Sequence, residues 1–325
     1  MVRNISRSEQ GEHSKNSPLV VIVGPTAVGK TALALRLGPR LRAEVVSADS
    51  RQVYREMDIG TAKPTPEERR LVPHHLIDIV APDEPFGLAQ YQSLAYAAIE
   101  DILSRGRLPF LVGGTGQYVR AVVEGWGIPR VPPDWALREE LYRQAEREGP
   151  AVLHARLQEL DPVAAQRIDP RNVRRVIRAL EVCLHTGEPI SKLQQRRPPP
   201  YHIVQIGLTM PRSSLYRRID ERVERMLAAG LVAEVERLVA RGYDYSLPSM
   251  SGLGYRQIGA YLRGEISLEE AVHLIKRETR RFVRQQYNWF RLDDERIHWF
   301  AADEHSPEEI AAFVQERLFR VVIEG

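Results

Sequence analysis

At 325 residues, with 43% hydrophobic and 27% charged residues, the chain has the composition of a globular protein with a substantial core. Its formal charge of +3 neither requires nor excludes a nucleic-acid partner, so the distribution of its 46 Lys and Arg residues matters more than their sum. The single cysteine, Cys183, excludes an intramolecular disulfide and a cysteine-based zinc cluster, and it fits a reducing compartment.

The first 17 residues are polar and contain no apolar signal-peptide core. No run of 18 apolar residues occurs in the sequence, which argues against a transmembrane helix. We therefore expect residues 1–17 to form a flexible tail, and we expect the protein to be cytoplasmic.

The apolar run Leu19–Val23 predicts a buried strand, and the eight residues after it match the P-loop pattern of ATP-binding proteins. These eight residues are Gly24, Pro25, Thr26, Ala27, Val28, Gly29, Lys30 and Thr31. Glycines in such a loop let backbone N–H groups point at a phosphate, and the helix that follows adds its positive N-terminal dipole. We predict a phosphate site in which Lys30 contacts the terminal phosphate and the Thr31 hydroxyl binds Mg²⁺.

Further strands are expected at 44–48, 76–80, 108–112, 201–208 and 296–300, with helical patterns between them. This alternation predicts an α/β fold, a P-loop NTPase-like parallel sheet flanked by helices. Residues 129–200 show helical periodicity without a convincing strand, which predicts an inserted all-helical subdomain. The α/β core would then consist of residues 18–128 and 201–325.

Asp49 follows the second predicted strand, at the sheet edge where parallel α/β proteins bind their ligands. Three interpretations stay open for it, namely a magnesium ligand, a general base, or an Asx turn with no further role. The glycine-rich segment 112–118 follows another strand and brings Thr115 to the same edge, although its glycines also fit a simple tight turn. His74 and His75 have no further ligands clustered with them, so we predict no metal site there.

Residues 276–291 read KRETRRFVRQQYNWFR, and at 100° per residue five arginines fall on one side of the expected helix. They are Arg277, Arg280, Arg281, Arg284 and Arg291. A solvated surface face usually mixes in acids, whereas only Glu278 lies in this segment, so we predict contacts to the phosphates of a long anion. A second basic group, Arg171, Arg174, Arg175 and Arg178, fits phosphate contacts and a charged helix face equally well.

Seven motifs, in their order and spacing, closely resemble those of tRNA dimethylallyltransferases of the bacterial type. They are GPTAVGKT, SADSRQVYREMDIGTAKP, PHHLID, LVGGTGQY, RVIRALEV, SGLGYRQ and the segment Thr279-Arg280…Gln286…Trp289-Phe-Arg291. The resemblance covers nearly the whole chain after Pro18. This family transfers the dimethylallyl group of dimethylallyl diphosphate to the exocyclic amine of the adenosine at tRNA position 37, next to the anticodon, and releases diphosphate.

The resemblance implies roles for individual residues. Asp49 would take a proton from the attacking amine, while Lys30 and Mg²⁺ held by Thr31 would stabilise the departing diphosphate. Arg218 corresponds to the family's arginine that faces the diphosphate. The residues expected to contact tRNA are Asp49, Ser50, Arg51, Gln52, Thr115, Arg138, Arg174, Arg175, Arg178, Met250, Gly252, Gly254, Tyr255, Arg277, Arg280, Arg281 and Arg284.

The chain departs from the family pattern at Gln285, where many members have a basic residue, so a charge is missing there. It also lacks the C-terminal Cys/His finger of eukaryotic members.

Two alternatives from other classes are a small-molecule P-loop kinase and a nucleic-acid-binding module with an inactive P-loop. The kinase leaves the arginine helix unexplained, and an inactive loop conflicts with the presence of Lys30, Thr31 and Asp49. Adenylate isopentenyltransferase shares the P-loop chemistry, but the insert favours a macromolecular acceptor. We expect a monomer that binds the tRNA anticodon stem-loop.

Overall fold

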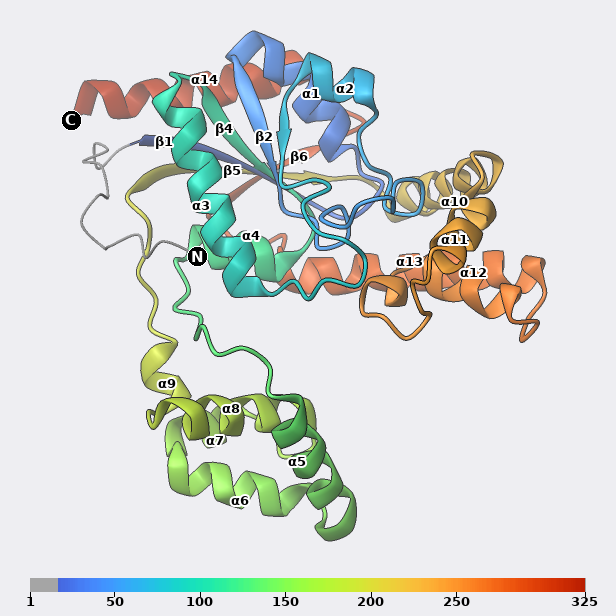
Figure 1. Ribbon diagram of the computed structural model, residues 1–325. Coiled ribbons are helices and arrows are strands. Elements are labelled where there is room, and N and C mark those ends of the chain that lie inside the picture. Colours follow the sequence, from blue (N-terminus) through green and yellow to red (C-terminus); the bar gives the residue numbers. More distant parts are fainter. Residues whose placement is uncertain (1–16, 325) are drawn as a thin grey trace, which may run out of the picture. The chain divides into compact units, whose positions relative to one another are not determined.

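The computed structural model describes residues 17–324 of the chain, with side-chain environments for residues 17–318. Two compact units make up this structure (Figure 1). Unit 1 contains the described residues up to Val119 and those from Pro200 onwards, and unit 2 is Arg120–Pro199. The segment expected as an insert at 129–200 thus corresponds to a unit that begins at Arg120. Apart from Ser17, the predicted tail lies outside the described residues.

A six-stranded parallel sheet forms the centre of unit 1, with the strand order β3-β2-β4-β1-β5-β6. The strands are β1 (Ser17–Val23), β2 (Ala43–Ser47), β3 (His74–His75), β4 (Leu108–Val112), β5 (Tyr201–Thr209) and β6 (Ile297–Ala301). Leu19–Val23 of β1 are fully buried, as expected for a central parallel strand that helices cover on both faces. Because β1 pairs with β4 and β5, the loops that follow these three strands lie at one edge of the sheet.

Helices connect the strands and pack on both faces of the sheet (Figure 1). The helices of unit 1 are α1 (Lys30–Leu41), α2 (Pro66–Leu71), α3 (Leu88–Ser104), α10 (Arg212–Ala228), α11 (Leu231–Ala240), α12 (Tyr255–Leu262), α13 (Leu268–Trp289) and α14 (Pro307–Glu324), and α4 (Gly116–Val123) runs from unit 1 into unit 2. Ile22 of β1, Leu37 of α1 and Val314 of α14 belong to one core cluster on one face. A second cluster joins α10 to α13 and includes Val223, Leu231 and Ile275.

The prediction of a strand at 76–80 is wrong. The third strand is only His74–His75, because Leu76 and Asp78 have φ angles of 63° and 58° and turn the chain away from the sheet. Within residues 76–80, Val80 forms an isolated parallel β-bridge with Tyr54, outside the strands of the sheet. The other predicted strands lie within two residues of the observed ones. The basic helix ends at Trp289, so Arg291 lies beyond it and pairs with Asp293 at 2.7 Å.

Unit 2 is helical and has its own core. Its helices are α5 (Trp135–Glu148), α6 (Pro150–Leu160), α7 (Pro162–Arg167), α8 (Val173–Thr186) and α9 (Ile190–Leu193). Asp134, Asp161 and Asn172 each accept a backbone N–H at the start of a helix, which explains where α5, α7 and α8 begin. Leu157 and Leu180 are fully buried in the core, and Cys183 is buried beside them. No helix in the described part of the chain has the length and apolar character that crossing a membrane requires.

Candidate active site

The P-loop connects β1 to α1 in the conformation that its glycines require. Gly24 has a φ of 141°, and a Cβ there would lie 2.4 Å from the carbonyl oxygen of Leu208. Gly29 has a φ of 113° and is the N-cap of α1. Lys30 Nζ donates hydrogen bonds to the carbonyl oxygens of Gly24 (2.9 Å) and Pro25 (2.8 Å), so the lysine folds back over its own loop. A phosphate is the anion that such a loop and helix N-terminus would bind.

Two cations, Lys30 and Arg222, lie at this loop, and no carboxylate of the described residues is bonded to either. Burial, and to a smaller extent the nearby Arg222, lower the pKa of Lys30 from 10.5 to about 7, against the attraction of Asp49. Burial also lowers the pKa of Arg222, whose Nη1 lies 3.4 Å from the Thr26 hydroxyl. Positive groups that are withdrawn from water and unpaired favour binding of an anion, since an anion would restore the lost solvation.

A cavity of about 570 Å³ in unit 1 brings many of the predicted site residues together. The predicted residues that line it are Thr26, Lys30, Asp49, Ser50, Arg51, Thr115, Gly252, Gly254, Tyr255 and Arg281. The segments that contribute them are far apart in the sequence and come from the P-loop, the ends of β2 and β4, and the α12 and α13 helices. This convergence at the carboxyl edge of the sheet is the usual place for a ligand in such a fold.

Asp49 forms an Asx turn and also faces this cavity. Its Oδ1 accepts the backbone N–H of Arg51 at 2.8 Å, and the described residues give its Oδ2 no hydrogen-bond partner. Thr115 Oγ1 accepts the N–H of Ser50 at 3.1 Å, which joins the β4 loop to the β2 loop. The turn therefore fixes one carboxylate oxygen and leaves the other available to a ligand, so the turn and a chemical role are compatible.

Gln286 of α13 is a site residue to which the sequence analysis assigned no role. Its Oε1 accepts the N–H of Thr26 at 2.8 Å, and its Nε2 donates to the carbonyl oxygen of Gly114 at 3.0 Å. One buried amide thus connects the P-loop to the glycine-rich loop after β4. The signal for it was present, because Gln286 is a polar residue three positions after Val283 and four before Phe290, on the apolar side of the helix.

Arg218 lies on α10 with its Nη1 3.3 Å from the carbonyl oxygen of Val28, at the back of the P-loop. It lines a second, larger cavity of about 1320 Å³ together with Gly29 and Thr31. Arg222, one helical turn further on, lines both cavities, as does Lys30. The sequence analysis named Arg218 and missed Arg222, although a spacing of four residues places both on one face of α10.

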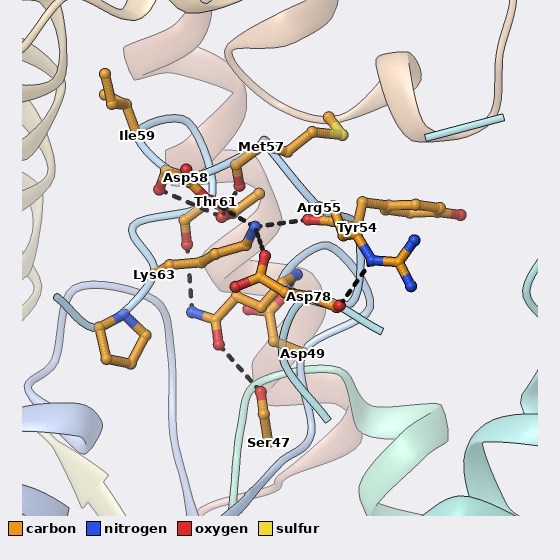
Figure 2. A network of polar contacts seen from close by, with 12 residues as sticks. Ser47, Asp49, Tyr54, Arg55, Met57, Asp58, Ile59, Thr61, Lys63 and Asp78 are labelled. Carbon is orange, nitrogen blue, oxygen red and sulfur yellow. Dashed lines mark hydrogen bonds and ion pairs between the residues drawn. The ribbon is translucent and has the colours of Figure 1, made fainter. Parts of the chain in front are cut away.

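The loop at 57–63 forms another wall of the site and is held by a polar network centred on Lys63 (Figure 2). Lys63 Nζ donates to the Tyr54 carbonyl oxygen at 2.6 Å and to carboxylates of Asp58 (2.7 Å) and Asp78 (2.5 Å). All three donors of the ammonium group are used, and its side chain is only 2% exposed. Lys63 therefore supports the loop and has no donor left for a ligand.

The same loop is held from the other side by a buried glutamate of α11. Glu234 accepts the N–H groups of Asp58, Ile59 and Gly60 at 2.8–3.1 Å, and the Tyr255 hydroxyl at 2.6 Å. A Cβ at Gly60 would lie 2.5 Å from the Tyr255 ring, so only glycine fits there. Gln52 completes the support, since its amide accepts from Ser47 at 3.0 Å and approaches the loop carbonyls of residues 61 and 62 at 3.4 Å.

The residues predicted to contact tRNA in unit 1 differ in exposure and in internal pairing. Arg277, Arg281 and Arg284 are exposed on α13. Met250 is 1% exposed and Gln52 is used inside the protein, so neither side chain is presented to solvent. Arg280 pairs with Asp220, and Arg51 donates to the carbonyl oxygen of Pro248 at 2.6 Å. The two paired arginines therefore support the fold in this structure.

The arginines of unit 2 divide in the same way. Glu181 is fully buried and accepts hydrogen bonds from Arg138 at 2.8 Å through both carboxylate oxygens, and Arg178 bonds it as well. Burial opposes ionisation of Glu181, but these bonds outweigh it and lower the pKa. Arg174 and Arg175 are exposed and have no carboxylate partner within the described chain. Only these two of the predicted tRNA-binding arginines of unit 2 are free of an internal partner.

Comparisons with known proteins agree on one family. Residues 52–293 match the family model described as IPP transferase, and residues 17–75 match the one described as isopentenyl transferase. A relative from Roseiflexus sp. named tRNA dimethylallyltransferase is 62% identical over 274 residues, which cover 84% of this chain and 90% of the relative.

Two solved structures are also similar. A tRNA isopentenylpyrophosphate transferase from Bacillus halodurans has a TM-score of 0.70 at 45% identity and covers 94% of this chain and 98% of its own. A eukaryotic dimethylallyltransferase acting on tRNA has a TM-score of 0.79 at 25% identity, with coverage of 94% and 80%.

Proposed function

This chain belongs to the IPP transferase family, and from that membership we propose that it transfers the dimethylallyl group of dimethylallyl diphosphate to the exocyclic amine of a tRNA adenosine. The protein is a transferase that modifies tRNA. The observation that supports this chemistry best in the structure is the pair of unpaired cations, Lys30 and Arg222, at a P-loop that opens on a cavity with Asp49. The acceptor we propose is the adenosine at tRNA position 37, beside the anticodon.

The reaction needs one bond to form and one to break. The amine nitrogen of adenosine attacks C1 of the dimethylallyl group, the C1–O bond breaks, and its electron pair leaves with the diphosphate. The proton that the amine loses goes to the carboxylate of Asp49, whose Oδ2 has no other hydrogen bond among the described residues. Because Oδ1 is fixed by the Asx turn, the carboxylate is oriented before substrate binds.

The leaving diphosphate would be bound by the P-loop N–H groups, Lys30, Arg218 and Arg222. Lys30 bonds two loop carbonyls in this structure and would exchange them for phosphate oxygens when the substrate arrives. Charge develops on the bridging oxygen as the C1–O bond breaks, so cations already oriented at that point stabilise the transition state more than the substrate. The adenine reaches this cavity out of its base stack.

Mg²⁺ is the cofactor that we propose for this site. The described residues contain no group of three or more His, Cys, Asp or Glu that could hold a metal. That composition fits Mg²⁺ bound through the Thr31 hydroxyl, with diphosphate oxygens and water as the other ligands, since Mg²⁺ keeps much of its hydration. When bound, the ion would neutralise charge on the leaving diphosphate. We further propose that the protein acts as a monomer, because residues of one chain line both cavities. We propose the cytoplasm as its compartment, because a single cysteine fits a reducing environment.

The test is transfer of radiolabelled dimethylallyl diphosphate to an unmodified anticodon stem-loop, with and without Mg²⁺. Asp49→Asn keeps an oxygen for the Arg51 N–H but cannot take up the proton, so we expect a loss of about 10²- to 10⁴-fold in rate. Asp244→Asn is the matched control. Asp244 forms a similar Asx turn on the surface, in which its Oδ1 accepts the backbone N–H of Ser246 at 2.8 Å. Full activity of Asp49→Asn would leave only a turn role for Asp49.

Phosphorylation of a small acceptor by ATP, without transfer to RNA, would contradict the proposed activity and favour a P-loop kinase. Binding of RNA without transfer by the wild-type protein would favour a binding module with an inactive P-loop. Transfer to free adenylate in preference to the stem-loop would identify the acceptor as a nucleotide.

A further inference from the structure

Three arginines from two helices surround the side chain of Tyr216. Arg212 Nε donates to the Tyr216 hydroxyl at 2.9 Å, and Arg284 Nη1 lies 3.5 Å from the same oxygen. The guanidinium carbons of Arg212 and Arg280 lie 5.1 Å and 5.3 Å from the centre of the tyrosine ring. We call Arg212, Tyr216, Arg280 and Arg284 the Tyr216 cluster. Its four members come from α10 and α13, which are packed side by side.

The Tyr216 cluster has more positive charge than the protein neutralises. Asp220 pairs with Arg280, and within the described chain neither Arg212 nor Arg284 has a carboxylate partner. The Asp220–Arg280 pair is itself incomplete, because Asp220 Oδ1 and Arg280 Nε are buried without a hydrogen bond. Like charges held this close repel each other and reduce stability, so their arrangement calls for a partner of negative charge.

The cluster is separate from the catalytic cavity. Arg212, Tyr216 and Asp220 are four residues apart and form one stripe of α10 facing α13, whereas Arg218 and Arg222 lie on the stripe facing the P-loop. None of the four members of the cluster lines either cavity described above. The cluster is therefore not a further part of the diphosphate site.

Tyr216 orders the two exposed arginines. Burial would raise the pKa of its phenol, but the hydrogen bonds from Arg212 and Arg284 outweigh burial and lower the pKa. Arg212 and Arg284 are exposed, so their remaining N–H groups point to solvent from a fixed base. An arginine that is held before binding loses less side-chain entropy when it takes up a phosphate.

From this geometry we propose that the Tyr216 cluster is a binding site for a backbone phosphate of tRNA, outside the reaction cavity. The proposal rests on the proposed function, because the partner it names is the RNA substrate. A polynucleotide is favoured over a free phosphate because further arginines continue from the cluster along α13. The exposed Arg277 and Arg281 lie on the same helix as Arg284, within about 10 Å along its axis, so the cations form a row. A row of cations matches successive phosphates of a chain.

Binding of a labelled anticodon stem-loop to the full-length protein, measured between about 0.05 and 0.2 M salt, tests this site. We expect Arg212→Ala to reduce affinity about fivefold at 0.15 M salt and to lower the slope of log K against log salt by about 0.7 to 0.9. Tyr216→Phe should weaken binding less and keep the slope, since both cations remain. Arg217→Ala is the matched control, because Arg217 is 74% exposed on the same helix and lies outside the cluster.

An Arg212→Ala protein that binds RNA with the affinity and slope of Arg217→Ala would overturn the proposal. So would an Arg212→Ala protein with an unchanged salt slope but a raised KM for dimethylallyl diphosphate, which would assign the cluster to the small substrate. If wild type binds the stem-loop through the cluster but transfers no prenyl group, the proposed function fails and the binding site stands.

Discussion

Half-buried cations are paired differently in the cavity of unit 1 and in the core of unit 2. In unit 2, Arg138 and Arg178 both bond the fully buried Glu181, so their charges are neutralised inside the protein. In unit 1, Lys30 and Arg222 have only carbonyl and hydroxyl oxygens as hydrogen-bond partners among the described residues. The pKa of both groups is lowered by burial. Both regions contain arginines on helices, and the sequence does not distinguish them.

The difference separates framework from function. A buried ion pair that is complete has no capacity for another anion, and removing one member leaves a charge without its partner. A cation without an internal partner lowers the free energy of unfolding, and an anionic ligand can supply the partner that the protein does not. By this criterion we assign Lys30 and Arg222 to the proposed binding site, and we expect Arg138 and Arg178 to stabilise the framework of unit 2. Substitutions of these residues and changes of pH test this difference in pairing.

The largest expected effect is on the stability of unit 2. Glu181→Ala leaves Arg138 and Arg178 without their acceptor, and it also removes the bond from the Asp134 N–H at 2.8 Å. We expect the free energy of unfolding to fall by about 3 kcal/mol, measured by urea denaturation. Glu188→Ala is the control, since Glu188 is exposed two residues after α8 ends. A change below about 0.5 kcal/mol in Glu181→Ala would show that the pair contributes little to the fold.

Arg222→Ala should have the opposite profile to Glu181→Ala, with a large loss of activity and no loss of stability. We expect kcat to fall by about 10²-fold, because a preorganised cation at the leaving group is lost. The free energy of unfolding should stay the same or rise, because no ion pair is broken. Arg217→Ala is the control in both assays, because Arg217 is an exposed arginine of α10 that lines neither cavity. Equal rates for the two variants would place Arg222 outside the chemistry.

The low pKa of Lys30 predicts how diphosphate binding depends on pH. With a pKa of about 7 instead of 10.5, Lys30 loses its charge above pH 7 in the free protein, and a bound anion restores it. Affinity for diphosphate should fall about tenfold per pH unit above pH 7, with proton uptake measurable by calorimetry in two buffers. Lys30→Met should abolish the proton uptake that is due to the protein. A pH-independent affinity between pH 7 and 9 would contradict this.

The lowered pKa of Lys30 also makes the free energy of unfolding depend on pH. Between pH 7 and 10.5 the unfolded chain binds more protons at Lys30 than the folded chain does. The contribution of this group to the free energy of unfolding therefore rises with pH across that window. The Lys30→Met protein should lack this rise, so the difference between the two unfolding curves isolates it.

The sheet could be predicted from the sequence because its strands are buried and its P-loop has a fixed spacing. Runs such as Leu19–Val23 leave few alternatives once Gly24 and Gly29 follow them. The prediction of a strand at 76–80 was wrong because apolar content does not reveal backbone dihedral angles. Leu76 and Asp78 both adopt a left-handed conformation, which ends the strand. The position of Asp49 and Thr115 at one cavity also followed from the sequence, since the carboxyl ends of parallel strands share an edge.

Pairing between distant residues was not available from the sequence. Arg222 and Gln286 were missed because their roles depend on α10 and α13 reaching the P-loop, 196 and 260 residues away along the chain. Arg280 and Arg51 are predicted to contact tRNA, and the sequence did not show that the first pairs with Asp220 and the second with loop carbonyls. Helical periodicity gives the face of a residue but not the residue opposite it. For the second basic group the structure shows which arginines are paired, Arg171 with Asp169 and Arg178 with Glu181, and the choice between phosphate contacts and a charged helix face stays a prediction for Arg174 and Arg175.

The smallest expected effect separates the arginines of that second group. Arg174→Ala and Arg175→Ala should each weaken binding of the stem-loop about fivefold at 0.15 M salt and lower the salt slope, because each is exposed without an internal partner. Arg178→Ala should instead lower the free energy of unfolding, since Arg178 also donates to the carbonyl oxygen of Val131 at 3.0 Å. Arg171→Ala is the control, because Asp169 already pairs with Arg171 at 2.7 Å on the surface. If all four variants change affinity and slope equally, internal pairing does not decide which arginine meets the RNA. If only Arg174→Ala and Arg175→Ala change the slope, the distinction drawn from the two units holds for an exposed helix face as well as for a buried cavity.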